Sequence, residues 1–565
     1  MIKLPESPAV FAGAVWSDVL PYYDQLASRS VTKETAAEWL QDWSEFEDLV
    51  GEARESAYFA YTCDTADEAK EAANLRFQTE IEPQAAEQRV RLARLLVESG
   101  YERPDLLEPL RAFRTDIELF REENVELKAE VERLSTEYQK VTGGLVADWN
   151  GEELPLPRLR PFMADPDRSI REKAWRLERQ QYIGQREILA RIFTDQYRLR
   201  QKIARNAGFK NFRDYQHQVF HRFDYTPDDC YRFHEAVLEK TVPAAKRIYE
   251  RHLQKLGLES LRPWDVEVDP DGRPALKPFS TNQEFIDRGR AIFQQVDPVL
   301  GARFDTLANE DLLDLESRKG KAPGGYMTEL PHRKRPLIFM NAAGVAGDVH
   351  TLVHEAGHCF HGFEYFEAGR LFCQRMPGME MGEVGSMAME LLSAPYWGRQ
   401  SGGYYSEEDY RRARIDHLEG IVLFFPHCAT VDALQHWIYT DPAGEDAGAR
   451  DDQWLRLRRQ FEIGVDYTGL TEEWVARWYR QLHFWEVPFY YIEYGIAQLG
   501  ALQIWRNARR DQQAAVSAYR RALALGSTRP LPELYRAADI KLAFDAATIG
   551  ELVELVEEEL AALQA

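Results

Sequence analysis

The chain contains 565 residues, enough for about three or four units of the usual domain size. Its 70 Lys and Arg residues against 93 Asp and Glu residues give a formal net charge of −23, which argues against a nucleic-acid backbone or an anionic membrane surface as the partner. With 44% hydrophobic and 29% charged residues, the composition is that of a globular protein and excludes disorder, collagen-like repeats and a coiled-coil rod.

Five cysteines without a CxxC pair favour reduced thiols over a disulfide framework. The N-terminus has only a short apolar run at residues 9–16 and makes a poor signal peptide. The longest apolar run, at residues 420–431, is interrupted by Pro426 and His427 and is shorter than a membrane span of about 18 residues. We therefore expect a soluble, cytoplasmic protein with neither a membrane nor a nucleic-acid partner.

Helical periodicity dominates the first two hundred residues, where apolar side chains recur every three or four positions in residues 66–99 and 112–140. The second stretch has a short heptad pattern interrupted only by Asn124, which predicts one long helix packed lengthwise on a partner. That partner could be another chain, but a helix of the same chain, such as residues 66–99, is the simpler expectation.

The pattern changes twice before the middle of the chain. Asn150 and Gly151 form a turn pair between short alternating segments and predict a β-hairpin near residues 145–160. Residues 260–341 are rich in Pro and Gly, and the best strand candidate is 336–341. Asp348 then stands where the N-cap of a new helix is expected. Helices dominate from there to the end of the chain.

A cluster of histidines follows this strand. Four of the thirteen histidines fall within twelve residues: His350, His354, His358 and His361. The core of the cluster is an H-E-x-x-H motif, His354-Glu355-Ala-Gly-His358. Residues four apart on a helix are separated by only about 40° in azimuth, so both imidazoles can bind one metal ion. Glu355 is then placed to act on a metal-bound water rather than on the metal.

A catalytic zinc usually has three protein ligands and one open position. Glu383 lies in a predicted second helix that starts after Pro377-Gly378 and ends before Pro395, with Glu390 two turns further along the same face. Carboxylates on an otherwise apolar helix are costly to bury unless a cation or hydrogen bonds satisfy them. We expect Glu383 to be the third ligand and Glu390 to orient a ligand histidine, although Glu390 could instead belong to a solvated helix face.

Spacing alone is not specific for a metal site. His217 and His221 have the same separation as the motif histidines, but they lack an intervening glutamate and a suitable acidic helix downstream. We interpret this pair as structural. Cys359 follows a proposed ligand and should point away from it on a helix.

The segment from His354 to His361, with Glu383 at this distance, resembles the zinc signature of the thimet oligopeptidase and oligoendopeptidase F family, closest to oligoendopeptidase F-like enzymes. The resemblance covers nearly the whole chain and is most specific from residue 321 to 495. Other similar segments are Lys321–Tyr326, Asp348–His354, Gln435–Tyr439, Pro488–Tyr494 and Leu531–Tyr535.

The resemblance implies a mainly α fold in which two helical halves enclose a deep substrate channel, with a small β-sheet next to the HExxH helix. We expect an N-terminal helical region at residues 1–195, which includes the hairpin, and a zinc peptidase catalytic region at residues 196–565.

The resemblance also directs attention to His483 and the tyrosines at 490, 491 and 494. Attack on a peptide carbonyl creates an oxyanion that needs a donor beyond the zinc, and neutral His or Tyr can supply one. Tyr491 and Tyr494 resemble the paired tyrosines of the family, but the register is open by one residue at Tyr490. The alternative is an aromatic stripe buried in a core.

Three further features could bind the peptide or support the site. The strand 336–341 could accept an extended substrate as an added strand, and Gly325 beside Tyr326 would let two backbones approach closely. His361, one turn beyond the motif, could lie near the metal or the substrate. An ordinary interior strand followed by a tight turn is nearly as good an interpretation of this region.

Together these features predict a metalloendopeptidase with one zinc ion per chain that hydrolyses internal bonds of short, unstructured oligopeptides, with Glu355 as the general base of a zinc-bound water. One alternative is a metallocarboxypeptidase or dipeptidyl carboxypeptidase on a similar helical scaffold. A non-catalytic peptide-binding protein is another, and the intact motif argues against it.

Overall fold

The computed structural model describes residues 3–565 of the chain. The chain divides into two compact units, each built from three separate segments. Unit 1 comprises Met1–Glu118, Leu276–Arg414 and Ala497–Leu542, and unit 2 comprises Leu119–Ala275, Ile415–Ile496 and Ala543–Ala565. The expected regions 1–195 and 196–565 stay a prediction.

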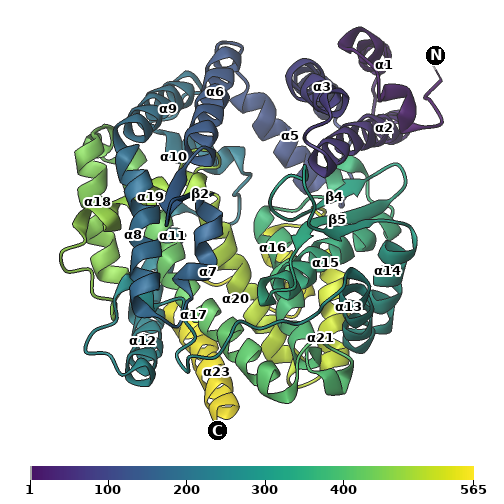
Figure 1. Ribbon diagram of the computed structural model, residues 1–565. Helices are drawn as coiled ribbons and strands as arrows, with labels where there is room; N and C mark the ends of the chain where they lie inside the picture. The colour runs from purple at the N-terminus through teal and green to yellow at the C-terminus, as the bar shows by residue number, and fades with distance from the viewer. Residues whose placement is uncertain (1–2) are drawn as a thin grey trace. The chain divides into compact units, whose positions relative to one another are not determined.

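Unit 1 is mainly helical and contains one three-stranded sheet (Figure 1). Its helices are α1 (Trp16–Ser28), α2 (Ala36–Cys63), α3 (Glu68–Arg76), α4 (Glu82–Glu98), α5 (Leu107–Leu119), α13 (Asn282–Val296), α14 (Pro298–Asn309), α15 (Ala346–Glu367), α16 (Met379–Ser393), α21 (Gln512–Leu523) and α22 (Leu531–Ala537). Two further helices, α17 (Glu407–Thr440) and α20 (Tyr491–Ala508), contribute residues to both units.

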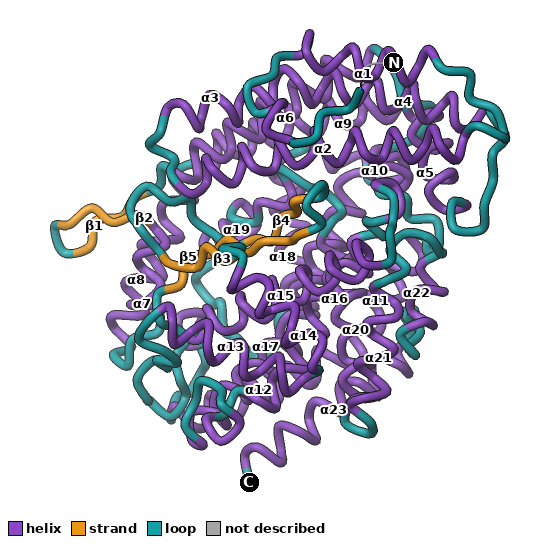
Figure 2. The backbone as a smooth tube through the Cα atoms, turned by 90° about the vertical axis from the view of Figure 1, so that its right-hand side faces the viewer, coloured by secondary structure: helices purple, strands orange, loops and turns teal. Residues whose placement is uncertain are grey.

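The sheet of unit 1 has the order β3-β5-β4, with β3 (Leu313–Glu316) parallel and β4 (Tyr326–Leu330) antiparallel to β5 (Arg335–Ala342). Because β5 is the central strand, both of its edges are already paired. The expectation that residues 336–341 receive a substrate strand is therefore wrong, and β4 is an edge strand instead. Figures 1 and 2 both show the sheet between α2 and α15.

Helices α15 and α16 cross closely, and glycine makes this crossing possible. A methyl group on Gly357 would lie 2.6 Å from the carbonyl oxygen of Gly385 and 2.6 Å from the Cα of Ser386. Both distances are far below van der Waals contact, so only glycine fits at this point of α15. The side of α15 packed in the core is apolar, and Leu352, Val353 and Phe360 are fully buried.

Unit 2 is also mainly helical and includes a two-stranded hairpin. Its remaining elements are α6 (Glu123–Gly143), β1 (Val146–Trp149), β2 (Glu152–Pro155), α7 (Arg160–Met163), α8 (Arg168–Gly184), α9 (Arg186–Asn206), α10 (Phe212–Val219), α11 (Pro227–Ala236), α12 (Val242–Leu256), α18 (Ala447–Phe461), α19 (Thr471–Tyr479) and α23 (Ala546–Gln564). The hairpin turns at Asn150 and Gly151, both with positive φ, as the turn pair predicts.

The single long helix predicted over residues 112–140 is wrong, because the chain breaks between α5 and α6. Apolar residues keep the same three- and four-residue spacing on both sides of the break, so the heptad pattern does not reveal it. The partner of α6 is a helix of the same chain, as expected, but it is α9 rather than residues 66–99. The buried amide of Asn124 donates to the carbonyl of Ile203 and accepts from the amide of Asn206, both on α9.

The prediction of a mainly α protein with a small sheet beside the HExxH helix is confirmed. The channel between two helical halves stays a prediction. Within residues 3–565, no helix combines the length and apolar character needed to cross a bilayer.

The substitution Gly357→Ala should force α15 and α16 apart, since its methyl group would overlap backbone atoms of α16. Overpacking of this kind costs about 1–3 kcal/mol, so we expect a lower melting temperature and a lower zinc content after dialysis against zinc buffer. Gly347→Ala is the matched control on the same helix, because a methyl group there meets nothing within 4 Å. Equal zinc content in the two variants would contradict the role given to this contact.

Candidate metal centre

The H-E-x-x-H motif lies in the middle of α15, and the start of this helix is fixed by Asp348. Its Oδ2 accepts hydrogen bonds from the backbone N–H groups of Ala343, at 2.8 Å, and Val345, at 2.9 Å. Val345 is the N-cap residue and Asp348 stands three residues inside the helix, which corrects the sequence-based position of the cap. The acidic side chain still serves the same end, because it ties the preceding loop to the first turn.

The fold brings the three expected ligands together. One ligand atom from each of His354, His358 and Glu383 lies within 4.8 Å of the others. The Oε2 atom of Glu383, on α16, is 3.5 Å from Nε2 of His354 and 3.6 Å from Nε2 of His358. The Glu383 side chain is 5% exposed, whereas the two imidazoles are 24% and 16% exposed. The group is therefore open to solvent on its histidine side.

Glu390 reaches the same group from the next turns of α16. Its Oε1 lies 2.7 Å from Nδ1 of His354, so the carboxylate favours a proton on Nδ1 and leaves the Nε2 lone pair free to bind a metal. Ser386 holds the other carboxylate, because its hydroxyl donates to Oε2 of Glu383 at 3.0 Å. The solvated helix face considered for Glu390 is thus not what the structure shows.

Glu355 lies near β4, and the backbone N–H of Met327 on this strand is among the groups that favour its ionised form. The residue is 8% exposed. Burial, with the nearby charge of Glu383, raises its pKa to about 7, although His354 and the Met327 amide act in the opposite direction. The protonated and ionised forms of this carboxyl group therefore differ little in free energy near pH 7.

The electrostatics of the group fit a cation. Burial alone would raise the pKa of Glu383, but His354 and His358 lower it to about 2, and burial lowers the pKa of His358 to about 4. Burial acts to lower the pKa of His354, but Glu383 and Glu390 raise it well above its usual value, so this imidazole would release a proton when a cation binds. A carboxylate and a neutral imidazole are the forms that bind metals. Two imidazoles, one carboxylate and an open side are the donor set of a catalytic zinc site, so these residues fit that ion.

The other expected residues near the motif have separate places. Cys359 and His361 are buried, and the His361 ring lies against Tyr365 rather than in the ligand group. Tyr326 is held by Thr62 of α2, with 2.6 Å between the two hydroxyl oxygens. A methyl group on Gly325 would come within 2.9 Å of the Thr351 side chain, so the lack of a side chain makes room for α15. The approach of a second backbone stays a prediction.

The expected His and Tyr cluster forms within unit 2. The ring of His483 lies 4.8 Å from that of Tyr491, 6.0 Å from that of Tyr494 and 6.3 Å from that of Tyr490. Helix α20 begins at Tyr491, so Tyr490 precedes it. All four side chains are only partly buried. The rings form a partly exposed cluster, which differs from a stripe enclosed in the core.

Gln481, which the sequence analysis missed, sets the state of His483. Its amide nitrogen lies 2.7 Å from Nδ1 of His483, while its amide oxygen lies 3.1 Å from Nε2 of His427. An amide donor to Nδ1 leaves the proton of neutral His483 on Nε2. Burial lowers the pKa of His483 to about 4, so the ring is neutral near pH 7 and its Nε2–H can donate.

The loop that carries His483 is anchored in the core of unit 2. The amide of Gln196 donates to the carbonyl of Trp485 at 3.0 Å, and the guanidinium of Arg200 donates to the carbonyl of Phe484 at 2.9 Å. Trp485 also stacks on Tyr138 with 4.4 Å between ring centroids. These contacts fix the backbone on the C-terminal side of His483.

The histidine pair used for comparison in the sequence does not form a pair in space. Helix α10 ends at Val219, and His221 follows it with a φ of 52°. The i, i+4 rule applies only inside a helix, so the two imidazoles have no common face. His217 instead lies near Cys230 and His436, a group that no sequence spacing indicates.

Comparisons with known proteins identify the family of the chain. The model of peptidase family M3 matches residues 162–553, and that of the peptidase M3 N-terminal domain matches residues 16–110. An oligoendopeptidase F homologue of Borreliella burgdorferi is 22% identical over 431 residues, which cover 73% of this chain and 70% of the relative.

Solved structures agree over the full length. PZ peptidase A with an inhibitor has a TM-score of 0.86 and 27% identity, covering 99% of this chain and 98% of that one. A protein provisionally named oligoendopeptidase F, from Bacillus anthracis str. Ames, has a TM-score of 0.81 and 26% identity, covering 99% of this chain and 97% of that one.

These matches confirm the predicted family and, with it, the predicted enzyme class of metalloendopeptidase. Because the family model extends from residue 162 to residue 553, and therefore over more than half of the sequence, the chain belongs to peptidase family M3.

Proposed function

We propose that the protein is a zinc-dependent endopeptidase that cleaves internal bonds of short, unstructured oligopeptides. His354, His358 and Glu383 would hold one zinc ion. The observation that carries this proposal is the convergence of these three side chains, with Glu390 fixing the tautomer of His354. When bound, zinc supplies Lewis-acid chemistry that polarises the scissile carbonyl and activates the attacking water.

The five cysteines, all thiols, support a reducing, cytoplasmic location.

Glu355 would act as the general base and then as the general acid. Its carboxylate takes a proton from the water as the oxygen attacks the carbonyl carbon. The same carboxyl group then gives this proton to the amide nitrogen as the C–N bond breaks. The nearby Met327 amide favours the ionised carboxylate, which is the form that accepts a proton from the water.

His483 with Tyr491 or Tyr494 would donate hydrogen bonds to the developing oxyanion. The Nε2–H of neutral His483 and a tyrosine O–H can both donate without carrying a charge that pairs with Glu355. The support for this assignment is the resemblance to the family, together with the tautomer set by Gln481 and the partial exposure of the rings.

The outer edge of β4 would bind the substrate backbone. Glu329 pairs with Pro336 of β5, and proline has no N–H, so this must be a pair without hydrogen bonds between the strands. Pairs with and without hydrogen bonds alternate along the strands, so Met327, two residues earlier, also belongs to a pair without them. The backbone groups of Met327 and Glu329 therefore face away from β5, on the side where Glu355 lies. An extended peptide can add to such an edge.

The substitution Glu355→Gln should keep the zinc but lower kcat by about 10²–10⁴, because the proton acceptor is lost. His358→Ala should instead lose the metal. Activity is measured on an internally quenched peptide blocked at both ends, and zinc by atomic emission. Wild-type turnover by Glu355→Gln would refute the role of Glu355. If the wild type cannot cleave blocked peptides but removes C-terminal residues from free ones, the enzyme is a carboxypeptidase instead.

Glu390→Ala should weaken zinc binding about 10–100-fold, the usual effect of losing the partner that orients a ligand histidine. Glu390→Gln keeps an oxygen acceptor for Nδ1 of His354 and should lie between this variant and the wild type. Competition with a fluorescent chelator gives the three dissociation constants. An unchanged constant in Glu390→Ala would remove the orienting role.

One of the variants Tyr491→Phe and Tyr494→Phe should lose about 10²–10³ in kcat, the usual cost of removing one oxyanion donor. KM and zinc content should stay near the wild-type values. Tyr490→Phe is the matched comparison, since Tyr490 lies just outside α20. If only Tyr490→Phe loses activity, the donor is Tyr490 rather than Tyr491 or Tyr494. If all three variants stay active, no tyrosine of this cluster donates to the oxyanion.

A further inference from the structure

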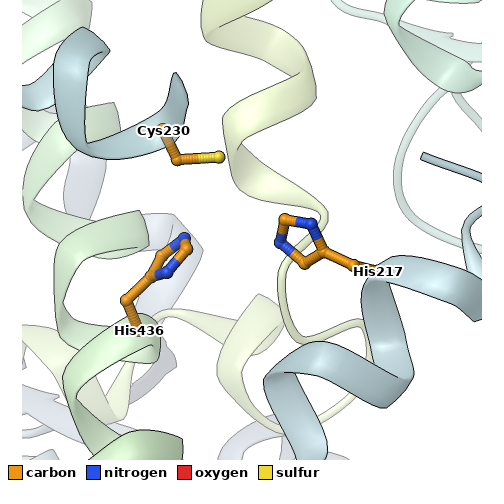
Figure 3. A group of neighbouring side chains, drawn as sticks. All are labelled: His217, Cys230 and His436. Carbon is orange, nitrogen blue, oxygen red and sulfur yellow. The ribbon is translucent and has the colours of Figure 1, made fainter. Parts of the chain in front are cut away.

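Three side chains with metal-binding atoms meet inside unit 2. His217 comes from α10, Cys230 from α11 and His436 from the part of α17 that belongs to unit 2. One ligand atom from each lies within 4.8 Å of the others. Figure 3 shows the thiol and the two rings turned toward a common space. None of these residues has a role in the hydrolysis proposed above.

The group is buried and incompletely hydrogen-bonded. His217, Cys230 and His436 are 4%, 0% and 1% exposed. Within residues 3–565, neither the Nδ1 of His217 nor the Nδ1 of His436 has a hydrogen-bond partner. Buried polar atoms are nearly always satisfied in folded proteins. Each ring therefore has binding capacity that the protein itself does not use.

Asp432 supplies negative charge beside the group. Its Oδ2 lies 2.8 Å from Nε2 of His234 and 3.3 Å from Nε2 of His436, and the residue is fully buried. Burial alone would raise the pKa of Asp432, but the two histidines hold it below its usual value, so the carboxylate is ionised. A carboxylate next to a ligand histidine is the common support of a metal site.

Arg222 lies on the other side of His217 and opposes a cation, but its charge is neutralised. Its Nη1 is 3.4 Å from Nε2 of His217, and its Nη2 is 2.7 Å from Oε1 of Glu493. Burial, with the charge of Arg222, lowers the pKa of His217 to about 2. The ring is therefore neutral. Because a guanidinium only donates, the Arg222 contact places the ring proton on Nδ1, and ligation through Nδ1 would need this proton to move to Nε2 while Arg222 keeps its bond to Glu493.

We propose that His217, Cys230 and His436 form a second zinc site, structural rather than catalytic, with Asp432 as its supporting carboxylate. Imidazole and thiolate are ligands that zinc prefers, and a closed, buried ligand set is typical of structural zinc. As the Zn–S bond forms, the Cys230 thiol proton is released to solvent. The thiolate and Asp432 then balance the two positive charges of the ion.

The three ligand atoms need to move only slightly closer together to bind a zinc ion. Ligand atoms at normal zinc distances lie roughly 3.3–3.8 Å apart, and the three side chains here are already within 4.8 Å. The proposal does not depend on the hydrolytic function. It predicts two zinc ions per chain, where the sequence analysis expected one.

Co²⁺ can report on this site alone, because a thiolate ligand gives a near-ultraviolet charge-transfer band and the H-E-x-x-H set contains no thiol. We expect metal-free His358→Ala protein to bind one Co²⁺ with this band. Adding Cys230→Ser in the same protein should abolish the band. Cys428→Ser is the matched control, a second buried cysteine of unit 2, and should keep it. Absence of the band in His358→Ala would overturn the proposal.

Zinc content gives an independent test on the full-length protein. After equilibration with zinc and removal of the excess, the wild type should hold two ions per chain, His358→Ala one and Cys230→Ser one. Cys230→Ser should still hydrolyse the blocked peptide, whereas His358→Ala should not. One ion per wild-type chain, retained in Cys230→Ser, would overturn the second site and leave the proposed function intact. If the wild type does not hydrolyse the peptide but the His358→Ala protein shows the Co²⁺ band, the proposed function is overturned and the second site stands.

Discussion

The proposed metal centre depends on the contact between α15 and α16 at Gly357. Neither helix contains all three proposed ligands: His354 and His358 come from one and Glu383 from the other. A residue with a Cβ at position 357 would overlap Gly385 and Ser386, and the spacing between the helices sets the distance from the carboxylate to the imidazoles. The glycine inside the motif therefore controls how close Glu383 comes to the two histidines.

Electrostatics separates this centre from the His and Tyr cluster of unit 2. At the centre, buried carboxylates accumulate beside two imidazoles, and a cation is the simplest way to stabilise them. Around His483, burial and the Gln481 amide favour a neutral ring that donates from Nε2. One group favours a positive ion and the other has uncharged donors, which are the two features that the proposed amide hydrolysis would use.

Features set by local spacing could be predicted from the sequence. The H-E-x-x-H helix and the hairpin at Asn150 follow from periodicity and turn chemistry, and Glu383 follows from a second helix bounded by Pro377 and Pro395. Features set by distant contacts could not. The strand order that makes β4 the edge depends on how residues 313–316 return to β5, and a break between α5 and α6 that keeps the apolar phase leaves no trace in the pattern.

The pair His217 and His221 shows a further limit. Their spacing suggests a shared helical face, but the helix ends between them, so the rule that links spacing to proximity does not apply. The true neighbours of His217 are Cys230 and His436, which lie 13 and 219 positions away in the sequence. Proximity of this kind arises only from tertiary packing.

The phase of β4 has one more consequence, for proline. A peptide added to this edge exchanges hydrogen bonds with Met327 and Glu329 through every second residue, while the residues between them turn their N–H groups away. A proline that faces the edge would forfeit a bond, whereas a proline at an intervening position would lose none. The position of proline in a peptide would then fix its register on the strand, and hence which of its bonds is presented for cleavage.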